Sequence, residues 1–198
     1  MKKLEHSDVE GALIRWVGLD TAHAKMVIHD IPHRPGMAAE LFCALAQAEV
    51  AVDMIVQSVT RLGESTLTFT LLEADRRKAF AIMKRVFVEL GADEVTTHGP
   101  IAKISVVGSN SKKKSSIATK VFQVLAAAAI DIEMISASDL NVSVVVGMEY
   151  AERAFHAICS VLEINAKFRE GHCAMSPGLR AIVAAGRSAC TSPGIRVD

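Results

Sequence analysis

LFCALAQAEVAVDMIVQSV, from Leu41 to Val59, is the stretch that decides the fold, because the chain contains it twice. Eighty residues later the chain reads VFQVLAAAAIDIEMISASD, from Val121 to Asp139, and the two stretches align without a gap. Asp53 aligns with Glu133, so an acid is kept at this position. The identical pairs include Phe42/Phe122, Leu45/Leu125, Met54/Met134, Ile55/Ile135 and Ser58/Ser138. Internal self-similarity of this length is the signature of repeated structural units. The sequence therefore predicts two copies of one fold.

Composition limits the classes of partner and compartment. The chain has 198 residues with 22 Lys+Arg against 22 Asp+Glu, so no net charge attracts nucleic acid or an anionic membrane over long range. No apolar run approaches the ~20 residues that a membrane-spanning helix needs. The four cysteines show no CxxC spacing and no secretory signal precedes them. We therefore expect a cytoplasmic protein that binds neither nucleic acid nor membrane, with Cys43 as a small buried thiol.

The first repeat predicts a β-α-β-β-α-β unit. Apolar residues at helical spacing indicate two helices, and branched or alternating residues indicate strands. The loop 30–36 holds two prolines and a glycine, which end a strand and can begin a helix. The expected strands are 25–29, 52–59, 65–71 and 94–97, and the expected helices are 37–48 and 79–90.

The second repeat follows the same order but has no clear final strand. Its expected strands are 101–107, 132–138 and 141–146, and its expected helices are 117–129 and 151–162. An unassigned apolar run, 12–17, ends at Gly18 and precedes the first repeat. We expect this run to complete the second sheet and to cover an edge that would otherwise be open. The predicted domains are 21–100 and 101–163 with strand 12–17, followed by a weakly ordered tail, 164–198, while the first nine residues are expected to be loose.

These motifs resemble the regulatory region of aspartate kinases, which carries two ACT domains. The resemblance covers roughly residues 12–163, and its most specific parts are Ile31–Ala39 (IPHRPGMAA), Val52–Val59 (VDMIVQSV) and Ile132–Ser138 (IEMISAS). It implies the α+β class, with two ferredoxin-like βαββαβ ACT domains in tandem. Each domain is expected to have an antiparallel sheet with its helices on one face. The βαββαβ pattern alone would imply no function.

The resemblance also implies a function. In this family, lysine or threonine binds at the interface of paired ACT domains and shifts an attached kinase toward an inactive state. The implied role is an allosteric regulatory chain of aspartate kinase, giving feedback control of aspartate-family amino-acid biosynthesis. The chain is then no enzyme on its own, because the kinase part with its Lys-Phe-Gly-Gly motif is missing. The implied partners are an amino-acid effector, a second copy of the chain and a catalytic subunit, with no cofactor.

The match places candidate effector contacts in both repeats. In the first repeat they are His33, Arg34, Pro35, Gly36, Met37, Ala38, Asp53 and Gln57, and in the second Ala118, Ala129, Asp131 and Ile132. Physical chemistry agrees for the first set. A loop that leads into a helix N-terminus offers backbone N–H groups to an α-carboxylate. The amide of Gln57 both donates and accepts, which suits a zwitterion or a hydroxyl.

Departures from the family pattern leave alternatives open. The family usually has Asp where this chain has His33, and often Asn where it has Ala51 and Ala129. The second repeat's loop, Gly108–Ser116, has lost the family's His-Pro-Gly. One alternative is a ligand-blind ACT module that only dimerises or acts as a scaffold. Another is an ACT sensor that serves a different enzyme or a transcription factor.

Other chemistries find weaker support in the sequence. The loop Gly108–Ser116 lacks the second glycine of a phosphate-binding P-loop, which favours a solvated basic loop. His23, His29 and His33 have no partnered Cys, so we expect no metal site. Asp53 and Glu133 are related by the repeat and are not an acid/base couple. No pattern of catalytic residues is recognisable, so we expect no catalytic site.

Overall fold

The computed structural model describes residues 2–5, 14–32, 34–59, 64–90, 94–108, 114–138, 141–162 and 169–170. It contains two compact units. The first-repeat unit is built on Ala24–Gly99, and the second-repeat unit combines Met1–His23 with Pro100–Cys173. Two strands, β2 (Ile14–Pro32) and β5 (Glu94–Gly108), run through this division, so each contributes one part to each unit.

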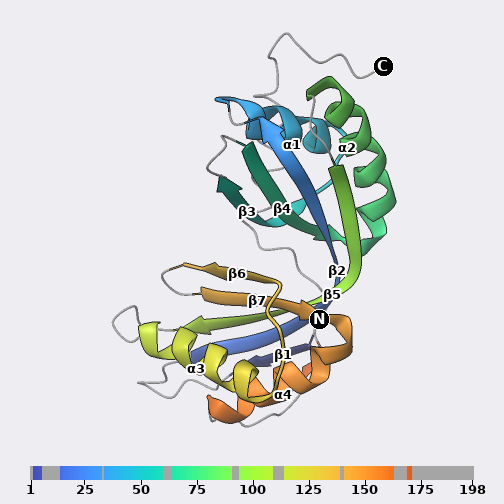
Figure 1. Ribbon diagram of the computed structural model, residues 1–198. Coiled ribbons are helices and arrows are strands. Elements are labelled where there is room, and N and C mark those ends of the chain that lie inside the picture. Colours follow the sequence, from blue (N-terminus) through green and yellow to red (C-terminus); the bar gives the residue numbers. More distant parts are fainter. Residues whose placement is uncertain are drawn as a thin grey trace. The chain divides into compact units, whose positions relative to one another are not determined.

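The first-repeat unit has an antiparallel sheet with two helices on one face (Figure 1). Its strand order is β3-β4-β2-β5. The further elements are α1 (Met37–Gln47), β3 (Val52–Val59), β4 (Glu64–Leu72), the short 3-10 helix η1 (Glu73–Asp75) and α2 (Arg76–Leu90). Alternation along β4 sends Leu67, Phe69 and Leu71 into the core, where they pack with residues of both helices. The ring of Phe69 meets that of Phe42 edge-on, at 5.6 Å between centroids.

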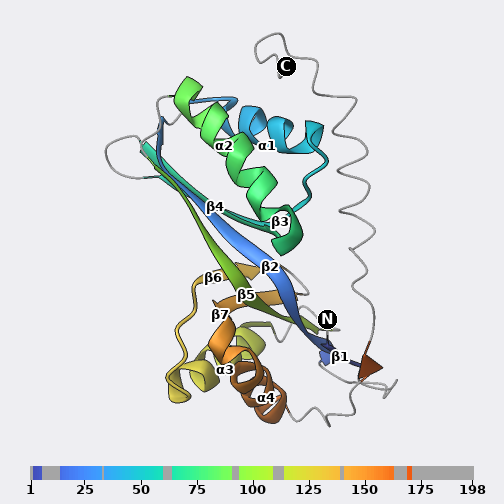
Figure 2. The ribbon, with the colours of Figure 1, turned by 90° about the vertical axis from the view of Figure 1, so that its right-hand side faces the viewer.

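The second-repeat unit repeats this arrangement with its fourth strand taken from the N-terminal part of β2. The strand order is β6-β7-β5-β2, with β1 paired to the outer edge of β2 (Figure 2). The further elements are β1 (Lys2–Glu5), α3 (Lys114–Ala127), β6 (Met134–Ala137), β7 (Asn141–Gly147), η3 (Met148–Tyr150), α4 (Ala151–Val161) and β8 (Arg169–Glu170). The prediction that an N-terminal strand completes the second sheet is confirmed.

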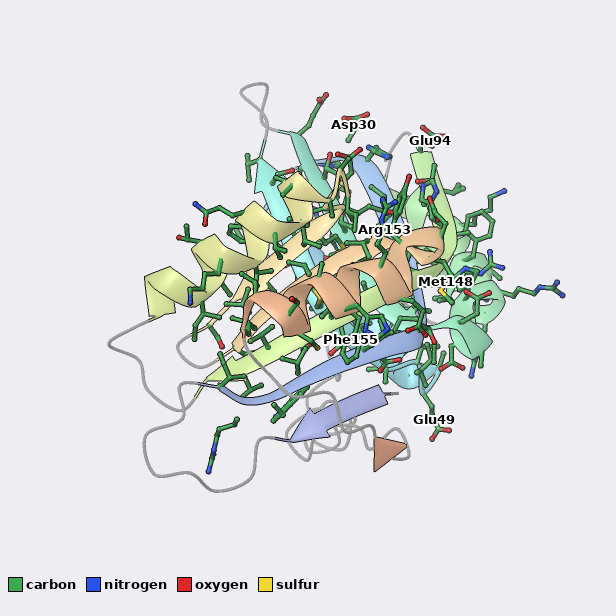
Figure 3. The ribbon with its side chains drawn as sticks, turned by 90° about the horizontal axis from the view of Figure 1, so that it is seen from below. Asp30, Glu49, Glu94, Met148, Arg153 and Phe155 are labelled. Atoms are coloured by element: carbon green, nitrogen blue, oxygen red, sulfur yellow. The ribbon has the colours of Figure 1, made fainter. Side chains whose placement is uncertain are left out.

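The core of the second-repeat unit shows why that strand belongs there. Ile14, Val17 and Leu19 are buried, at 6%, 0% and 2% exposure, among residues of β5, β7 and both helices. Phe155 of α4, labelled in Figure 3, belongs to the same cluster and is 0% exposed. Burial of a large apolar side chain contributes roughly 1.5–3 kcal/mol. The N-terminal strand is therefore part of the core as well as of the sheet.

Several observed strands end at other residues than the sequence predicts. The predicted strands 12–17 and 25–29 are one 19-residue strand, β2, and the strands 94–97 and 101–107 are one strand, β5. Gly18 does not end β2, because the ladder continues through it and pairs it with Lys3 of β1. The N-terminal residues expected to be loose include β1, and the tail expected to be weakly ordered includes β8, which pairs with β1. The rest of the tail lies outside the described residues.

The two repeats agree even in how their first helices end. Glu49 and Ala129 occupy equivalent positions, and both adopt the left-handed conformation, with φ of 59° and 51°. In both repeats the N–H of this residue donates to the carbonyl three residues earlier in the chain. The N–H of the next residue donates to the carbonyl five residues earlier, from Val50 to Leu45 and from Ile130 to Leu125. This is the Schellman pattern that satisfies the last carbonyls of a helix.

Two cysteines lie within the described helices. Cys159 of α4 is buried, and this burial raises the pKa of its thiol to about 11, so the thiol stays protonated at neutral pH. Cys43 of α1 is partly exposed and disulfide-bonded, so its interpretation as a buried thiol is wrong. Among the described residues, none of the helices combines the length and apolarity required to cross a membrane.

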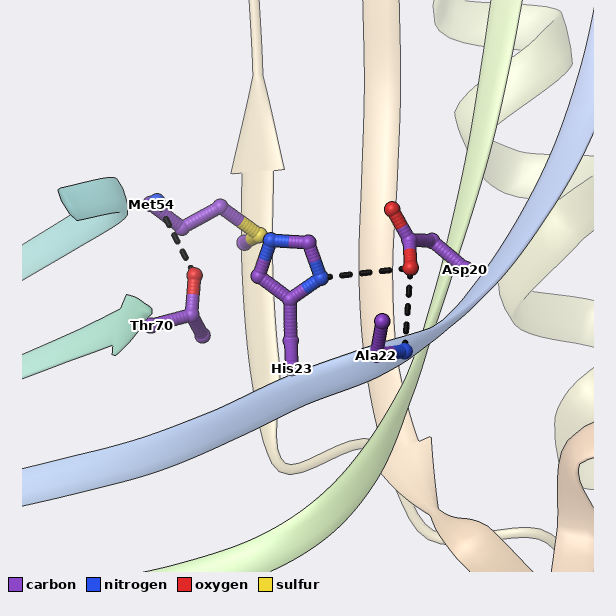
Figure 4. A network of polar contacts seen from close by, with 5 residues as sticks. All are labelled: Asp20, Ala22, His23, Met54 and Thr70. Atoms are coloured by element: carbon purple, nitrogen blue, oxygen red, sulfur yellow. Dashed lines mark hydrogen bonds and ion pairs between the residues drawn. The ribbon is translucent and has the colours of Figure 1, made fainter. Parts of the chain in front are cut away.

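A buried carboxylate, Asp20, lies beside His23 on β2 within the second-repeat unit (Figure 4). Asp20 is 5% exposed, and its Oδ1 accepts a hydrogen bond of 3.0 Å from the N–H of Ala22. Nδ1 of His23 lies 3.3 Å from the same oxygen. Burial alone would raise the pKa of Asp20, but the hydrogen bonds from His23 and Ala22 and the charges of His23 and Lys103 together lower it to about 2. The folded state therefore favours the carboxylate.

We predict that Asp20→Asn lowers the free energy of unfolding of the second-repeat unit at pH 7 by about 2 kcal/mol. Folding lowers the pKa of Asp20 from 3.8 to about 2, so the ionised carboxylate stabilises the folded state. This stabilisation is present above pH 4 and is lost as the pH falls from about 4 to about 2. Urea unfolding of both proteins at pH 7 and pH 2.5 should show the difference shrinking. The exposed Asp131→Asn is the control. A difference that does not change with pH would contradict the prediction.

Candidate functional site

The first half of the candidate site is the loop that leads into α1. Gly36 is the N-cap residue and has φ 90°, a left-handed value that glycine adopts without strain. Its carbonyl accepts the N–H of Glu40 at 3.0 Å, and the Arg34 carbonyl accepts the N–H of Met37 at 3.4 Å. The first turn of a helix has N–H groups without intrahelical acceptors and carries a partial positive charge. This turn can therefore receive a carboxylate.

A bidentate ion pair lies across this loop. The guanidinium of Arg34 donates two hydrogen bonds to the carboxylate of Glu40, at 2.7 and 2.6 Å. These bonds raise the pKa of Arg34 and lower the pKa of Glu40, so both groups stay charged at neutral pH. Both side chains remain accessible, with 47% and 32% exposure. The loop thus presents a cation and an anion side by side, next to the helix N-terminus.

The second half of the candidate site is the edge strand β3. Asp53 is partly exposed, and Gln57 is exposed. Gln57 stands opposite Leu67 of β4, and its amide donates a long hydrogen bond of 3.4 Å to the hydroxyl of Ser65. Residues opposite each other on antiparallel strands share a face. Gln57 therefore lies on the face that α1 and α2 cover, because Leu67 belongs to the core beneath these helices.

The predicted contacts differ in what they can offer a ligand. Pro35, Gly36 and Ala38 are exposed, whereas the side chain of Met37 is buried at 6% exposure, which leaves its backbone for a ligand. His33 lies outside the described residues. In the second-repeat unit Ala118 is partly buried, Ala129 and Asp131 are exposed, and Ile132 packs against the core. The structure thus brings the first-repeat candidates into one unit and the second-repeat candidates into the other.

Sequence reasoning missed two residues of the first-repeat unit. Glu40 was counted only as part of a helix, although an arginine six residues earlier could have suggested a partner. Thr70, whose hydroxyl accepts the N–H of Met54 at 3.0 Å, lies in the expected strand 65–71, but nothing in that pattern singles it out. In the described part of the chain, no group of three or more His, Cys, Asp or Glu is placed to hold a metal ion.

Comparison with known proteins identifies the units. The family model "ACT domain" matches residues 26–87 and 104–162, one match in each repeat. The aspartokinase of Pseudomonas aeruginosa is 34% identical over 167 residues, which are 84% of this chain and 40% of that protein. The chain therefore spans less than half the length of this relative.

Solved structures give the same result. The regulatory subunit of aspartate kinase from Thermus thermophilus, in its ligand-free form, matches with a TM-score of 0.71 and 35% identity, over 75% of this chain and 98% of that chain. The aspartate kinase from Synechocystis matches with a TM-score of 0.73 and 34% identity, over 82% of this chain and 29% of that chain. The chain belongs to the ACT-domain family, with two ACT domains in tandem as in the regulatory region of aspartate kinases.

Proposed function

We propose that this chain is an allosteric regulatory chain of aspartate kinase that binds lysine or threonine for feedback control of aspartate-family amino-acid biosynthesis. The observation that carries the proposal is the likeness to the Thermus thermophilus regulatory subunit, a match that covers 98% of that subunit and 75% of this chain. The accessible loop at the start of α1 supports it. Regulation then consists of a coupling free energy, typically ~1–3 kcal/mol, between the effector and the states of the kinase.

In this proposal the first-repeat unit receives the amino acid at its loop and edge strand. Backbone N–H groups of the first turn of α1 bind the α-carboxylate, at the turn that the left-handed conformation of Gly36 makes. Gln57 contacts the polar part of the ligand. The remaining predicted contacts, Ala118, Ala129, Asp131 and Ile132, complete a site when ACT domains pair.

We also propose that the chain forms a homodimer through its ACT domains and associates with a catalytic subunit. Ile55 on the edge strand β3 is 51% exposed, and Ile135 at the equivalent position on the edge strand β6 is 46% exposed. Val56 and Val59 add further exposed apolar surface to β3. Edge strands that carry apolar residues favour pairing with another chain, because their N–H and C=O groups lack strand partners on one side.

Isothermal titration of the full chain with lysine, threonine and the other amino acids tests the proposal, with sedimentation to measure the oligomer. We expect lysine or threonine to bind and the protein to sediment as a dimer. A dimer without amino-acid binding would favour the ligand-blind scaffold. Binding of a different amino acid would favour a sensor for another enzyme or a transcription factor.

His33 is expected to weaken effector binding and to make it depend on pH. We propose that the effector's ammonium lies near this residue, where the family usually supplies a carboxylate. A protonated imidazole repels an ammonium, and an unperturbed histidine titrates near ~6.5. Titration calorimetry should therefore show weaker binding at pH 5.5 than at pH 8. His33→Asp should bind about tenfold more tightly at pH 8, since charge-assisted hydrogen bonds are roughly twice as strong as neutral ones.

The matched control for this prediction is His29→Asp, which adds the same carboxylate on β2, outside the proposed site. If wild type binds lysine or threonine equally well at both pH values, or if His33→Asp binds no better, His33 is not the ammonium contact.

A further inference from the structure

The pairing of β3 with β4 contains one irregularity. Val52 stands opposite Leu71 and Ile55 opposite Phe69, so two residues of β3, Asp53 and Met54, face the single residue Thr70. This arrangement is a β-bulge, which inserts one extra residue into a strand and leaves it outside the regular ladder.

The side chain of Thr70 binds the extra residue. Its hydroxyl accepts the N–H of Met54 at 3.0 Å (Figure 4). Thr70 is 0% exposed and Met54 is 7% exposed, so water does not readily replace this acceptor. A buried N–H that loses its acceptor costs roughly 1–3 kcal/mol. The hydroxyl therefore favours the bulged register over a regular one.

The bulge decides which face each later residue of β3 occupies. Side chains alternate along a strand, so a shift of one residue moves every following side chain to the opposite face. In the observed register Gln57 stands opposite Leu67, on the face that α1 and α2 cover. In a regular register that continued from Val52, Gln57 would lie on the other face. Gln57 thus shares the side of the loop at the start of α1 only because of the bulge.

The second-repeat unit shows that the fold itself does not need this hydroxyl. Ile135 stands opposite Val144 as Ile55 stands opposite Phe69, which makes Val145 the equivalent of Thr70. Valine has no hydroxyl. There the corresponding strand β6 has four residues against eight in β3, and the N–H of Glu133 bonds to the backbone carbonyl of Val145 at 2.8 Å. Two residues, Glu133 and Met134, thus face the single residue Val145 as Asp53 and Met54 face Thr70, and the repeats differ in the side chain at this position, a hydroxyl in Thr70 and none in Val145.

We propose that Thr70 is a positioning residue for amino-acid binding by the first-repeat unit. Its hydroxyl holds the β3 bulge and thereby sets Asp53 and Gln57 for the ligand. This inference rests on the proposed function, because it assumes that β3 contacts an amino acid.

Titration calorimetry with lysine and threonine on the full chain tests the inference, with hydrogen exchange at the Met54 amide as a second readout. Thr70→Val removes the hydroxyl and keeps the shape, so we expect binding about tenfold weaker or more and faster exchange at Met54. Thr70→Ser keeps the hydroxyl and should bind nearly as wild type. The control Thr66→Val lies four residues earlier on the same face of β4 and should also bind as wild type.

The outcomes separate this inference from the proposed function. If wild type binds and Thr70→Val binds equally well, the inference is wrong and the proposed function stands. If Thr70→Ser binds as weakly as Thr70→Val, the methyl group matters and the hydroxyl does not, which also overturns it. If wild type binds neither amino acid, both proposals fail. Thr70→Ala serves as a second variant without the hydroxyl. If neither Thr70→Val nor Thr70→Ala folds, the hydroxyl is a requirement of the fold and the inference is overturned.

Discussion

A chain that lacks residues 1–18 is expected to lose the folded second-repeat unit while the first-repeat unit stays folded. The deletion removes β1 and the start of β2, including the buried Ile14 and Val17. It also leaves the neighbouring part of β5 as an open sheet edge. Each of these side chains stabilises by roughly 1.5–3 kcal/mol, and small domains are stable by only about 5–15 kcal/mol. The loss is large enough to unfold the unit.

Hydrogen exchange on the truncated chain measures this result. Amides of β7 and of Ile101–Val107 in β5 should lose protection, while amides of β4 should keep it. Deletion of residues 1–12 is the matched control, because it removes β1 but keeps Ile14 and Val17 in the core. Full protection of β7 in the longer deletion would show that the N-terminal strand does not hold the second-repeat unit together.

Much of this architecture could be predicted from the sequence, because the repeat supplies an internal comparison. The missing last strand of the second repeat and the extra apolar run at 12–17 were visible only when the two copies were placed side by side. Alternation along residues 65–71 likewise predicted a strand, and its alternate residues Leu67, Phe69 and Leu71 are the ones that enter the core. These predictions depend on hydrophobic pattern, which is set by burial and is recorded directly in the residue types.

Strand ends were predicted less well, because they depend on partners far away in the chain. Gly18 looked like a stop signal, yet the ladder with β1 carries the strand through it. The short strands β1 and β8 pair mainly through backbone groups, so the residues KKLE and RE give no hydrophobic alternation to detect. Backbone hydrogen bonds with a distant partner override weak local preferences.

In the candidate site, too, features set by the local sequence were predictable, and features set by residues distant in the sequence were not. The loop before α1 was predictable, because Pro32, Pro35 and Gly36 precede a helix and have local consequences. The ion pair of Arg34 with Glu40 joins a loop residue to the first turn of α1, and its geometry depends on how the chain turns at Gly36. The role of Thr70 depends on a bulge, which is a property of two paired strands and cannot be read from either strand alone.

Phe69→Ala is expected to destabilise the first-repeat unit by about 3–5 kcal/mol, the usual range for removing a buried phenylalanine. Phe69 is 0% exposed and belongs to the core cluster between the sheet and the helices of this unit. The substitution also removes its edge-on contact with Phe42, and aromatic pairs of this kind add ~0.5–1.5 kcal/mol. Urea unfolding measures the loss of stability, and hydrogen exchange on the folded protein should show lower amide protection along β4 and α1.

Phe155→Ala is the matched control, because Phe155 is equally buried in the core of the second-repeat unit. Phe155→Ala should lower the protection of amides along β7 and α4 and leave β4 protected. Phe69→Ala should lower the protection of β4 and α1 and leave β7 protected. Each unit has its own core cluster, so each should respond to its own cavity. If either substitution lowered protection equally in both units, the two ACT domains would unfold as one cooperative body. A change at the effector loop of one domain would then reach the other through shared stability, so the same measurement bears on how regulation spreads through the chain.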